Sequence, residues 1–159
     1  MSEAVRKHRL TFRQVDLEPV LSGRKTATIR FSRVAARVRP GDTLTFAFGN
    51  RMRPEILTAA AARVDHSDLT EQLEQMRKVD AELDSLTEQE EAEMDAAAAV
   101  METWTPEDHR TFLRSDGVPA ELLDALEAAG GDYNNVLLEA DARGLSMCST
   151  VWWQGVRRG

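Results

Sequence analysis

The sequence predicts an α+β fold in which both ends of the chain form a small β-sheet and a long acidic helical segment precedes the final strand. That segment is either an insertion into a β-barrel or the α half of an α+β domain. Two observations predict this fold. Apolar and polar residues alternate in short runs through the first 64 residues and again near the carboxyl end, which is typical of strands. From about residue 66 to residue 144, apolar residues recur every three or four positions, which is typical of amphipathic helices. We expect a single domain over residues 1–159.

The first half of the chain predicts strands separated by turns and one short helix. Residues 9–12 predict a strand, and residues 16–21 predict a short helix with Pro19 in its first turn. Gly23 ends this helix, because glycine adopts the left-handed conformation of a helix cap easily. The next expected strands are residues 26–31, 43–48 and 55–64. The last of these is rich in alanine and is also compatible with a helix.

The second half predicts a series of helices and a returning strand. A capping box begins at Thr87, and Pro106 occupies the first helical position that follows Thr105. The expected helices are residues 69–86, 88–101, a third from 105, 119–129 and 135–143. Residues 146–154 then predict the final strand, with Trp152 and Trp153 on opposite faces. One of the two tryptophans is expected in the core, and the sequence leaves open which one.

The composition excludes several classes of protein. Hydrophobic residues make up 42% of the 159 residues and charged residues 30%, and no apolar run is long enough to cross a membrane. Residues 1–10 lack the apolar stretch of a signal peptide. A single cysteine, Cys148, excludes a disulfide framework, and the three histidines are too widely spaced to suggest a zinc site. We therefore expect a cytoplasmic protein without a metal or cofactor.

Charge is distributed unevenly along the chain. Residues 1–63 contain 13 lysines and arginines against 5 acidic residues, whereas residues 64–159 contain 7 against 22. A basic half favours an anionic ligand. The acidic helices are either solvated faces or a surface for a basic protein partner, and the oligomeric state is not readable.

Residues 23–30 contain the highest concentration of side chains that could react with or bind a ligand. In a strand, Thr28 and Arg30 point to the same face as Thr26, and Lys25 lies at the entrance of the strand. A lysine acts as a base or nucleophile when burial lowers its pKa, and an arginine offers a rigid fork to a phosphate or a base edge. A carbonyl-bearing or anionic ligand fits this set. An exposed basic strand explains the same residues without any ligand.

Residues 10–48 resemble the ASCH family, a group of PUA-like β-barrels. The family pattern Gly-x-Lys-x-x-(Glu or Thr)-x-Arg falls on Gly23, Lys25, Thr28 and Arg30, and Gly41-Asp42-Thr43-Leu44 is similar to the turn that follows. Within the family, the small bacterial N4-acetylcytidine amidohydrolases are the most similar. The resemblance covers about a quarter of the chain and implies a PUA-like barrel with the segment of residues 66–144 inserted before its last strand.

The resemblance also implies site residues. Lys25 matches the catalytic lysine and Thr28 the catalytic threonine of a metal-independent hydrolase. The family uses a glutamate from the helical region, and its spacing from Thr87-Glu88 falls on Met94. We therefore assign the role to the neighbouring Glu93, with Glu90 and Asp95 as alternatives. The residues expected to bind the substrate are Gly23, Arg24, Thr26, Arg30, Arg33, Arg37 and Arg51.

Three functions are compatible with these residues. The first is an amidohydrolase that releases an acyl group from a modified nucleoside such as an N4-acylated cytidine. The second is an RNA-binding module or ribonuclease of the PUA-like type, with the loop arginines on the phosphate backbone. The third is a protein-interaction module that uses the acidic helices. Residues 101–145 are additional to the small family enzymes and could form a lid, a partner surface or a dimer contact.

Overall fold

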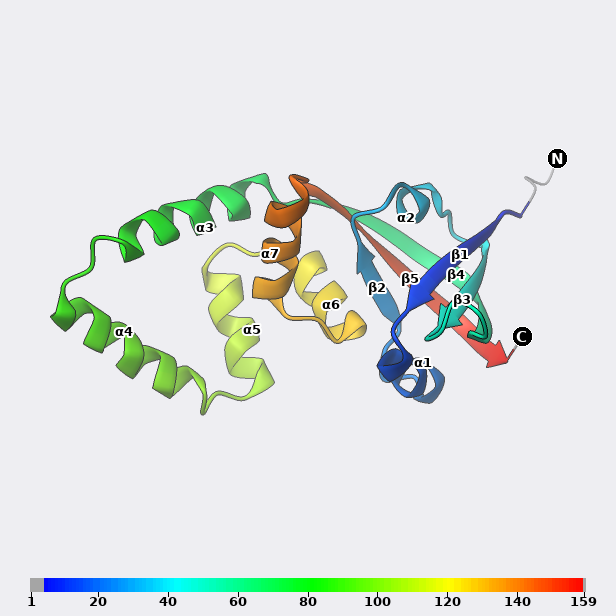
Figure 1. The fold of residues 1–159 in the computed structure, drawn as a ribbon, viewed down its shortest axis with the longest axis horizontal. Coiled ribbons are helices and arrows are strands. Elements are labelled where there is room, and N and C mark those ends of the chain that lie inside the picture. The colour runs from blue at the N-terminus through cyan, green and yellow to red at the C-terminus, as the bar shows by residue number, and fades with distance from the viewer. Residues whose placement is uncertain (1–4, 159) are drawn as a thin grey trace. The chain divides into compact units, whose positions relative to one another are not determined.

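The structure, a computed structural model, describes residues 5–158. Their strands form one five-stranded sheet curled into a half-barrel (Figure 1). The first four residues of the stretch inspected for a signal peptide lie outside that range. The strands are β1 (Lys7–Phe12), β2 (Ala27–Arg30), β3 (Thr43–Phe48), β4 (Glu55–Asp68) and β5 (Met147–Arg158). They are arranged in the order β1-β3-β4-β5-β2, and only β1 and β3 pair in parallel. Both ends of the chain therefore contribute to one mixed sheet, as predicted.

Most of the first-half elements follow their local signals. A 3-10 turn (Gln14–Asp16) leads into α1 (Leu17–Ser22), which Gly23 ends with a φ of 81°. Two short elements were not predicted, the 3-10 turn and the five-residue helix α2 (Arg33–Arg37). The hydroxyl of Ser32 caps it by accepting a hydrogen bond from the Ala35 amide at 3.2 Å.

Strand β4 is longer than predicted. It continues to Asp68 because residues 63–68 pair with β5. Its buried side chains are Leu57, Ala59 and Ala61, whereas the alternate residues Ile56, Thr58 and Ala60 are half-buried. Small alanines fit either face, so only the large Leu57 marks the side that faces the core.

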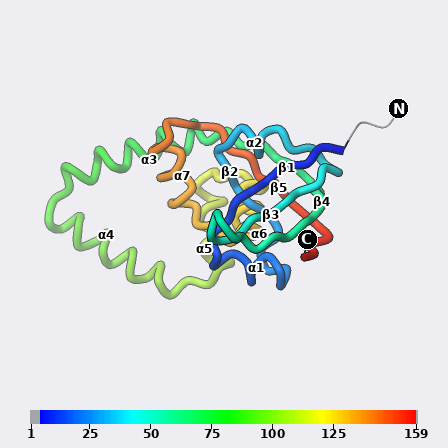
Figure 2. Tube along the Cα trace, turned by 45° about the vertical axis from the view of Figure 1, so that its right-hand side comes forward, coloured from blue at the N-terminus to red at the C-terminus, as the bar shows by residue number. Residues whose placement is uncertain are grey.

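The helical segment lies between β4 and β5 in the chain. Its helices are α3 (Thr70–Leu83), α4 (Glu88–Met101), α5 (Pro106–Ser115), α6 (Ala120–Ala129) and α7 (Tyr133–Arg143). Thr87 caps α4 by accepting a hydrogen bond from the Glu90 amide at 3.2 Å, the first half of the predicted capping box. The reciprocal box is found at Thr105, which accepts from the Asp108 amide at 3.2 Å while its own amide donates to the Asp108 carboxylate at 3.0 Å. Helix α3 ends three residues before the predicted Leu86. Figure 2 follows the trace from β4 through these helices and back into β5.

The described chain divides into two compact units, and the single domain expected over residues 1–159 stays a prediction. The first unit contains the described residues of Met1–Leu69 and Asp124–Gly159, and therefore the whole sheet and α7. The second unit is Thr70–Leu123. It contains 15 acidic residues against 4 lysines and arginines, so most of the negative charge of the chain belongs to it.

An aromatic cluster fills the concave side of the sheet. Phe12 stacks on Phe48 at a centroid distance of 5.1 Å, and Phe46 meets Trp153 edge to face at 4.8 Å. Trp153 is thus the core tryptophan. Trp152 lies on the opposite face, where its indole N–H donates to Asp65 at 3.2 Å. Among residues 5–158, the helices are all too short or too polar to cross a lipid bilayer.

Candidate functional site

The curl of the sheet brings its two edge strands, β1 and β2, close together. The guanidinium of Arg30 on β2 donates from Nη2 to the backbone carbonyl of Thr11 on β1 at 2.6 Å. The same guanidinium carbon lies 4.7 Å from the centre of the Phe12 ring, a cation–π distance. Arg30 therefore connects the two edges of the half-barrel, and the residues of the predicted motif lie beside this connection.

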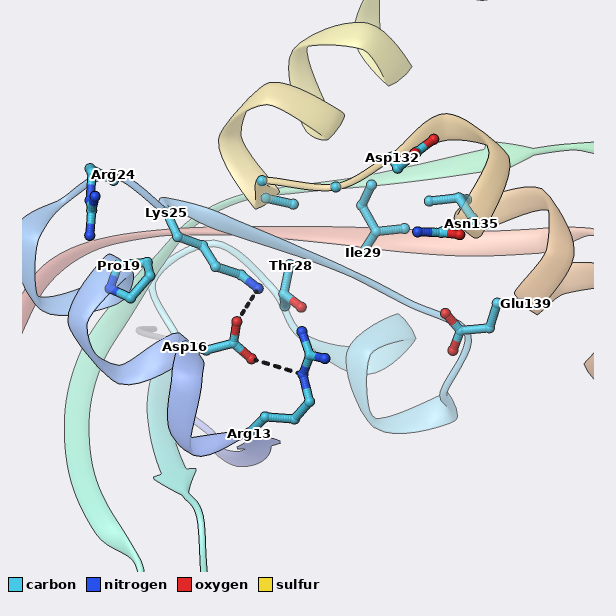
Figure 3. A pocket seen from close by; sticks show the side chains of 14 residues that line it. Arg13, Asp16, Pro19, Arg24, Lys25, Thr28, Ile29, Asp132, Asn135 and Glu139 are labelled. Carbon is cyan, nitrogen blue, oxygen red and sulfur yellow. Dashed lines mark ion pairs between the residues drawn. The ribbon is translucent and has the colours of Figure 1, made fainter. Parts of the chain in front are cut away.

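Lys25 is held between α1 and β2. Gly23 turns the chain at the end of α1, and the Lys25 amide then donates to the carbonyl of Pro19 at 2.9 Å. Its Nζ lies 3.5 Å from Oδ1 of Asp16 (Figure 3), and both side chains are largely buried. Burial lowers the pKa of Lys25, and the negative charge of Asp16 opposes this shift without cancelling it. The amine is therefore neutral more often than a solvated lysine, as a general base requires.

Thr28 lies next to Lys25 and is only 5% exposed. Its Oγ1 accepts a hydrogen bond from Nε of Arg30 at 2.9 Å. A cationic donor fixed on this oxygen favours negative charge there, since charge-assisted hydrogen bonds are the stronger ones. Burial also lowers the pKa of Arg30, the direction expected for a cation withdrawn from water. In Figure 3, the Lys25 amine and the Thr28 hydroxyl point into the same space.

That space is a cavity of about 550 Å³ within the first unit, in the size range of small-molecule sites. Its walls come from α1 and the turn before it, from β2, and from the end of α6 with α7. The lining residues are Arg13, Asp16, Pro19, Arg24, Lys25, Thr28, Ile29, Ala129, Gly130, Gly131, Asp132, Asn135, Val136 and Glu139.

The charges around this cavity balance. Three of its lining residues are basic, Arg13, Arg24 and Lys25, and three are acidic, Asp16, Asp132 and Glu139. Arg24 is also engaged outside the cavity, because it forms an ion pair with Glu18. The lining thus carries no formal net charge when all six groups are ionised, which suits an uncharged polar ligand better than a polyanion.

The structure brings together part of the predicted set. Lys25, Thr28 and Arg24 line the cavity, and Gly23, Thr26 and Arg30 adjoin them in the chain. The other predicted binding residues do not line it. Arg33 and Arg37 are exposed on α2, and Arg51 is exposed in the loop between β3 and β4.

The predicted carboxylates belong to the second unit. Glu93 is exposed on α4, together with the alternatives Glu90 and Asp95, and none of the three lines the cavity. The catalytic role of Glu93 stays a prediction. The carboxylate beside Lys25 is that of Asp16.

Sequence reasoning missed Asp16, Asn135 and Glu139 as site residues. The sequence predicts Asp16 only as the first residue of a short helix, nine residues before Lys25. Nothing local in the sequence indicates that α7 returns to β2. The residue before β2 is joined to α6, the helix that precedes α7, by a long-range hydrogen bond in which the Thr26 amide donates to the carbonyl of Ala128 at 2.8 Å.

Among residues 5–158, no three histidine, cysteine or acidic side chains are grouped as metal ligands. In comparisons with known proteins, no family model, curated protein or solved structure matches this chain.

Proposed function

We propose that this protein is an ASCH-like amidohydrolase that releases the acyl group of an N4-acylated cytidine or a similar amide, with a lysine rather than a metal as the activating group. One observation carries the proposal. A buried lysine with a lowered pKa shares a cavity with a threonine hydroxyl that a guanidinium polarises, and a carboxylate orients the lysine. Base, nucleophile and orienting group are the parts that acyl transfer requires.

The reaction proceeds in two halves. Neutral Lys25 takes the proton of the Thr28 hydroxyl, and Oγ1 attacks the acyl carbonyl carbon. The lysine ammonium then returns this proton to the leaving nitrogen as the C–N bond breaks, which releases cytidine and leaves an acyl ester on Thr28. Water attacks the ester while Lys25 accepts its proton, and the carboxylic acid departs as Thr28 regains its hydrogen. Arg30 stabilises negative charge on Oγ1 in both halves.

The balanced charge of the cavity supports a free nucleoside as the substrate. A site for an RNA backbone requires an excess of positive charge, and binding to it falls steeply with salt. The exposed arginines Arg33, Arg37 and Arg51 favour an alternative function, an RNA-binding module without amidohydrolase activity. They lie outside the cavity, so RNA binding there is separable from the chemistry of Lys25 and Thr28.

The test is incubation of the purified protein with N4-acetylcytidine, with cytidine release followed by chromatography. We expect release by the wild type and a loss of at least about 100-fold in kcat/KM for Lys25→Met and for Thr28→Val. Lys78→Met, on the exposed surface of α3, is the matched control and should retain full activity.

Two results contradict the proposal: no release by the wild type, or release that survives Lys25→Met. In either case, RNA affinity measured at increasing salt concentration tests the alternative. Steep salt dependence that Arg33→Met weakens would support an RNA-binding module.

A further inference from the structure

Helix α7 supplies a polar wall to the cavity, opposite Lys25 and Thr28. Its residues Asn135 and Glu139 are four positions apart and therefore share one face of the helix. Both line the cavity, and in Figure 3 both side chains point from α7 toward β2. The resemblance implies that residues 101–145, which include this wall, are additional to the small family enzymes.

The position of α7 is fixed by its own packing. Asp132 caps the helix by accepting a hydrogen bond from the Asn134 amide at 2.9 Å. Two neighbouring side chains of the helix are packed in the interior, since Leu137 is 4% exposed and Ala140 is fully buried. The bond from Thr26 to Ala128 ties the preceding helix, α6, to the start of β2. These contacts hold the helix that presents Asn135 and Glu139 to the cavity.

The chemistry of this wall selects neutral groups that carry hydrogen-bond donors. A carboxylate accepts hydrogen bonds only, and its two oxygens can receive two neighbouring hydroxyls. A carboxamide both donates and accepts. Arg143 pairs with Glu139 at 3.1 Å, one turn further along, and holds its carboxylate in place. A phosphate at the same wall would meet the negative charges of Glu139 and Asp132.

We infer that Asn135 and Glu139 form a subsite for the hydroxyl-bearing half of the ligand, the ribose of a nucleoside, while the acyl amide lies at Lys25 and Thr28. The inference rests on the proposed function for the identity of the reacting group. The recognition of an unphosphorylated sugar by α7 concerns binding alone, so it can be tested independently of the hydrolase reaction.

The experiment measures binding rather than turnover. Titration calorimetry compares cytidine, cytosine and cytidine 5′-monophosphate on the wild type, Asn135→Ala, Glu139→Gln and the control Glu121→Gln. The control removes one charge from the exposed surface of α6, outside the cavity.

We expect the wild type to bind cytidine more tightly than cytosine. Each of the two α7 variants should weaken cytidine binding roughly tenfold, the usual cost of one hydrogen bond to a charged or polar partner, and leave cytosine binding unchanged. Cytidine 5′-monophosphate should bind more weakly than cytidine to the wild type, and Glu139→Gln should reduce that difference. Glu121→Gln should behave as the wild type.

Equal affinity of the wild type for cytidine and cytosine, binding of neither, or equal weakening of both ligands by the α7 variants would overturn the subsite. These outcomes are distinct from failure of the hydrolase. If N4-acetylcytidine is not cleaved but cytidine binding depends on Asn135 and Glu139, the subsite holds without the proposed reaction. If N4-acetylcytidine and N4-acetylcytosine are cleaved with equal kcat/KM by the wild type and by Glu139→Gln, the reaction holds without the subsite.

Discussion

Replacement of Arg30 by methionine tests whether the closing contact between β1 and β2 also orients the candidate nucleophile. Arg30 makes three contacts: 2.9 Å to Thr28 Oγ1, 2.6 Å to the Thr11 carbonyl and 4.7 Å to the Phe12 ring. Methionine replaces the unbranched stem of arginine but carries no guanidinium, so it keeps the packing of the stem and removes all three contacts.

The expected loss of stability follows from how well water can replace each contact. Thr28 is buried, so its oxygen loses its donor at a cost of about 1–2 kcal/mol. Thr11 is exposed, so water replaces the bond to its carbonyl at a cost of about 0.5 kcal/mol. The contact with Phe12 contributes about 1 kcal/mol. Relief from burying a charge offsets part of this sum, so we expect Arg30→Met to lower the free energy of unfolding by about 2 kcal/mol.

The assay is urea unfolding followed by the fluorescence of the tryptophans on β5. Arg33→Met on α2 removes an exposed arginine nearby in the sequence and should change the free energy of unfolding by less than about 0.5 kcal/mol. Arg30→Lys keeps the charge but not the planar guanidinium, so its loss of unfolding free energy should lie between those of Arg30→Met and Arg33→Met. If Arg30→Met and Arg33→Met have equal effects, Arg30 does not close the half-barrel, and its proposed hold on Thr28 fails with it.

Two further predictions concern stability. The Arg39 amide, which donates to Asp42 at 2.9 Å, lowers the pKa of Asp42, so this carboxylate stabilises the fold above its unfolded pKa of about 4 and ceases to do so as the pH falls through its folded value. Asp42→Asn should therefore lower the urea midpoint strongly at pH 7 and little at pH 2, and a loss of equal size at both values would contradict this. Trp153→Ala should cost about 3–5 kcal/mol and Trp152→Ala about 1 kcal/mol, because only the former empties the core; equal losses in urea unfolding would show that the two faces are misassigned.

The elements that the sequence predicts well are those with local signals. The strand of residues 43–48 was predicted with the bounds that it has, because its alternation is strict and a Gly-Asp turn precedes it. The helix break before Glu88 was predicted because the residues that cap α4, from Thr87 onward, are adjacent in the sequence. Helix α2 was missed because its five residues are too few to show a period.

The residues of the candidate site also differ in whether a local sequence signal predicts them. Lys25 and Thr28 are neighbours in one motif, so the sequence alone proposed them. Asn135 and Glu139 reach the same cavity only through the return of α7 to the sheet, more than 100 residues later in the chain. Composition and periodicity describe α7 as an ordinary amphipathic helix, and they contain no information about which strand it will face.

The family resemblance and the geometry favour different residues as the carboxylate partner of Lys25. The resemblance favours Glu93, which is exposed on α4. The geometry favours Asp16, whose Oδ1 lies 3.5 Å from Lys25 Nζ in the same unit. The substitutions Asp16→Asn and Glu93→Gln each remove one negative charge with little change in volume, so they form a matched pair.

The two variants are distinguished by the pH profile of kcat/KM for N4-acetylcytidine. The charge of Asp16 opposes the lowering of the Lys25 pKa by burial, so its removal lowers that pKa further. A general base works in its neutral form, and therefore the acidic limb of the profile should move to lower pH in Asp16→Asn while kcat falls as the amine loses its orientation. Glu93→Gln should leave both unchanged. The opposite result is full activity in Asp16→Asn and no activity in Glu93→Gln. It would contradict the assignment of Asp16 as the catalytic carboxylate and support the prediction of Glu93.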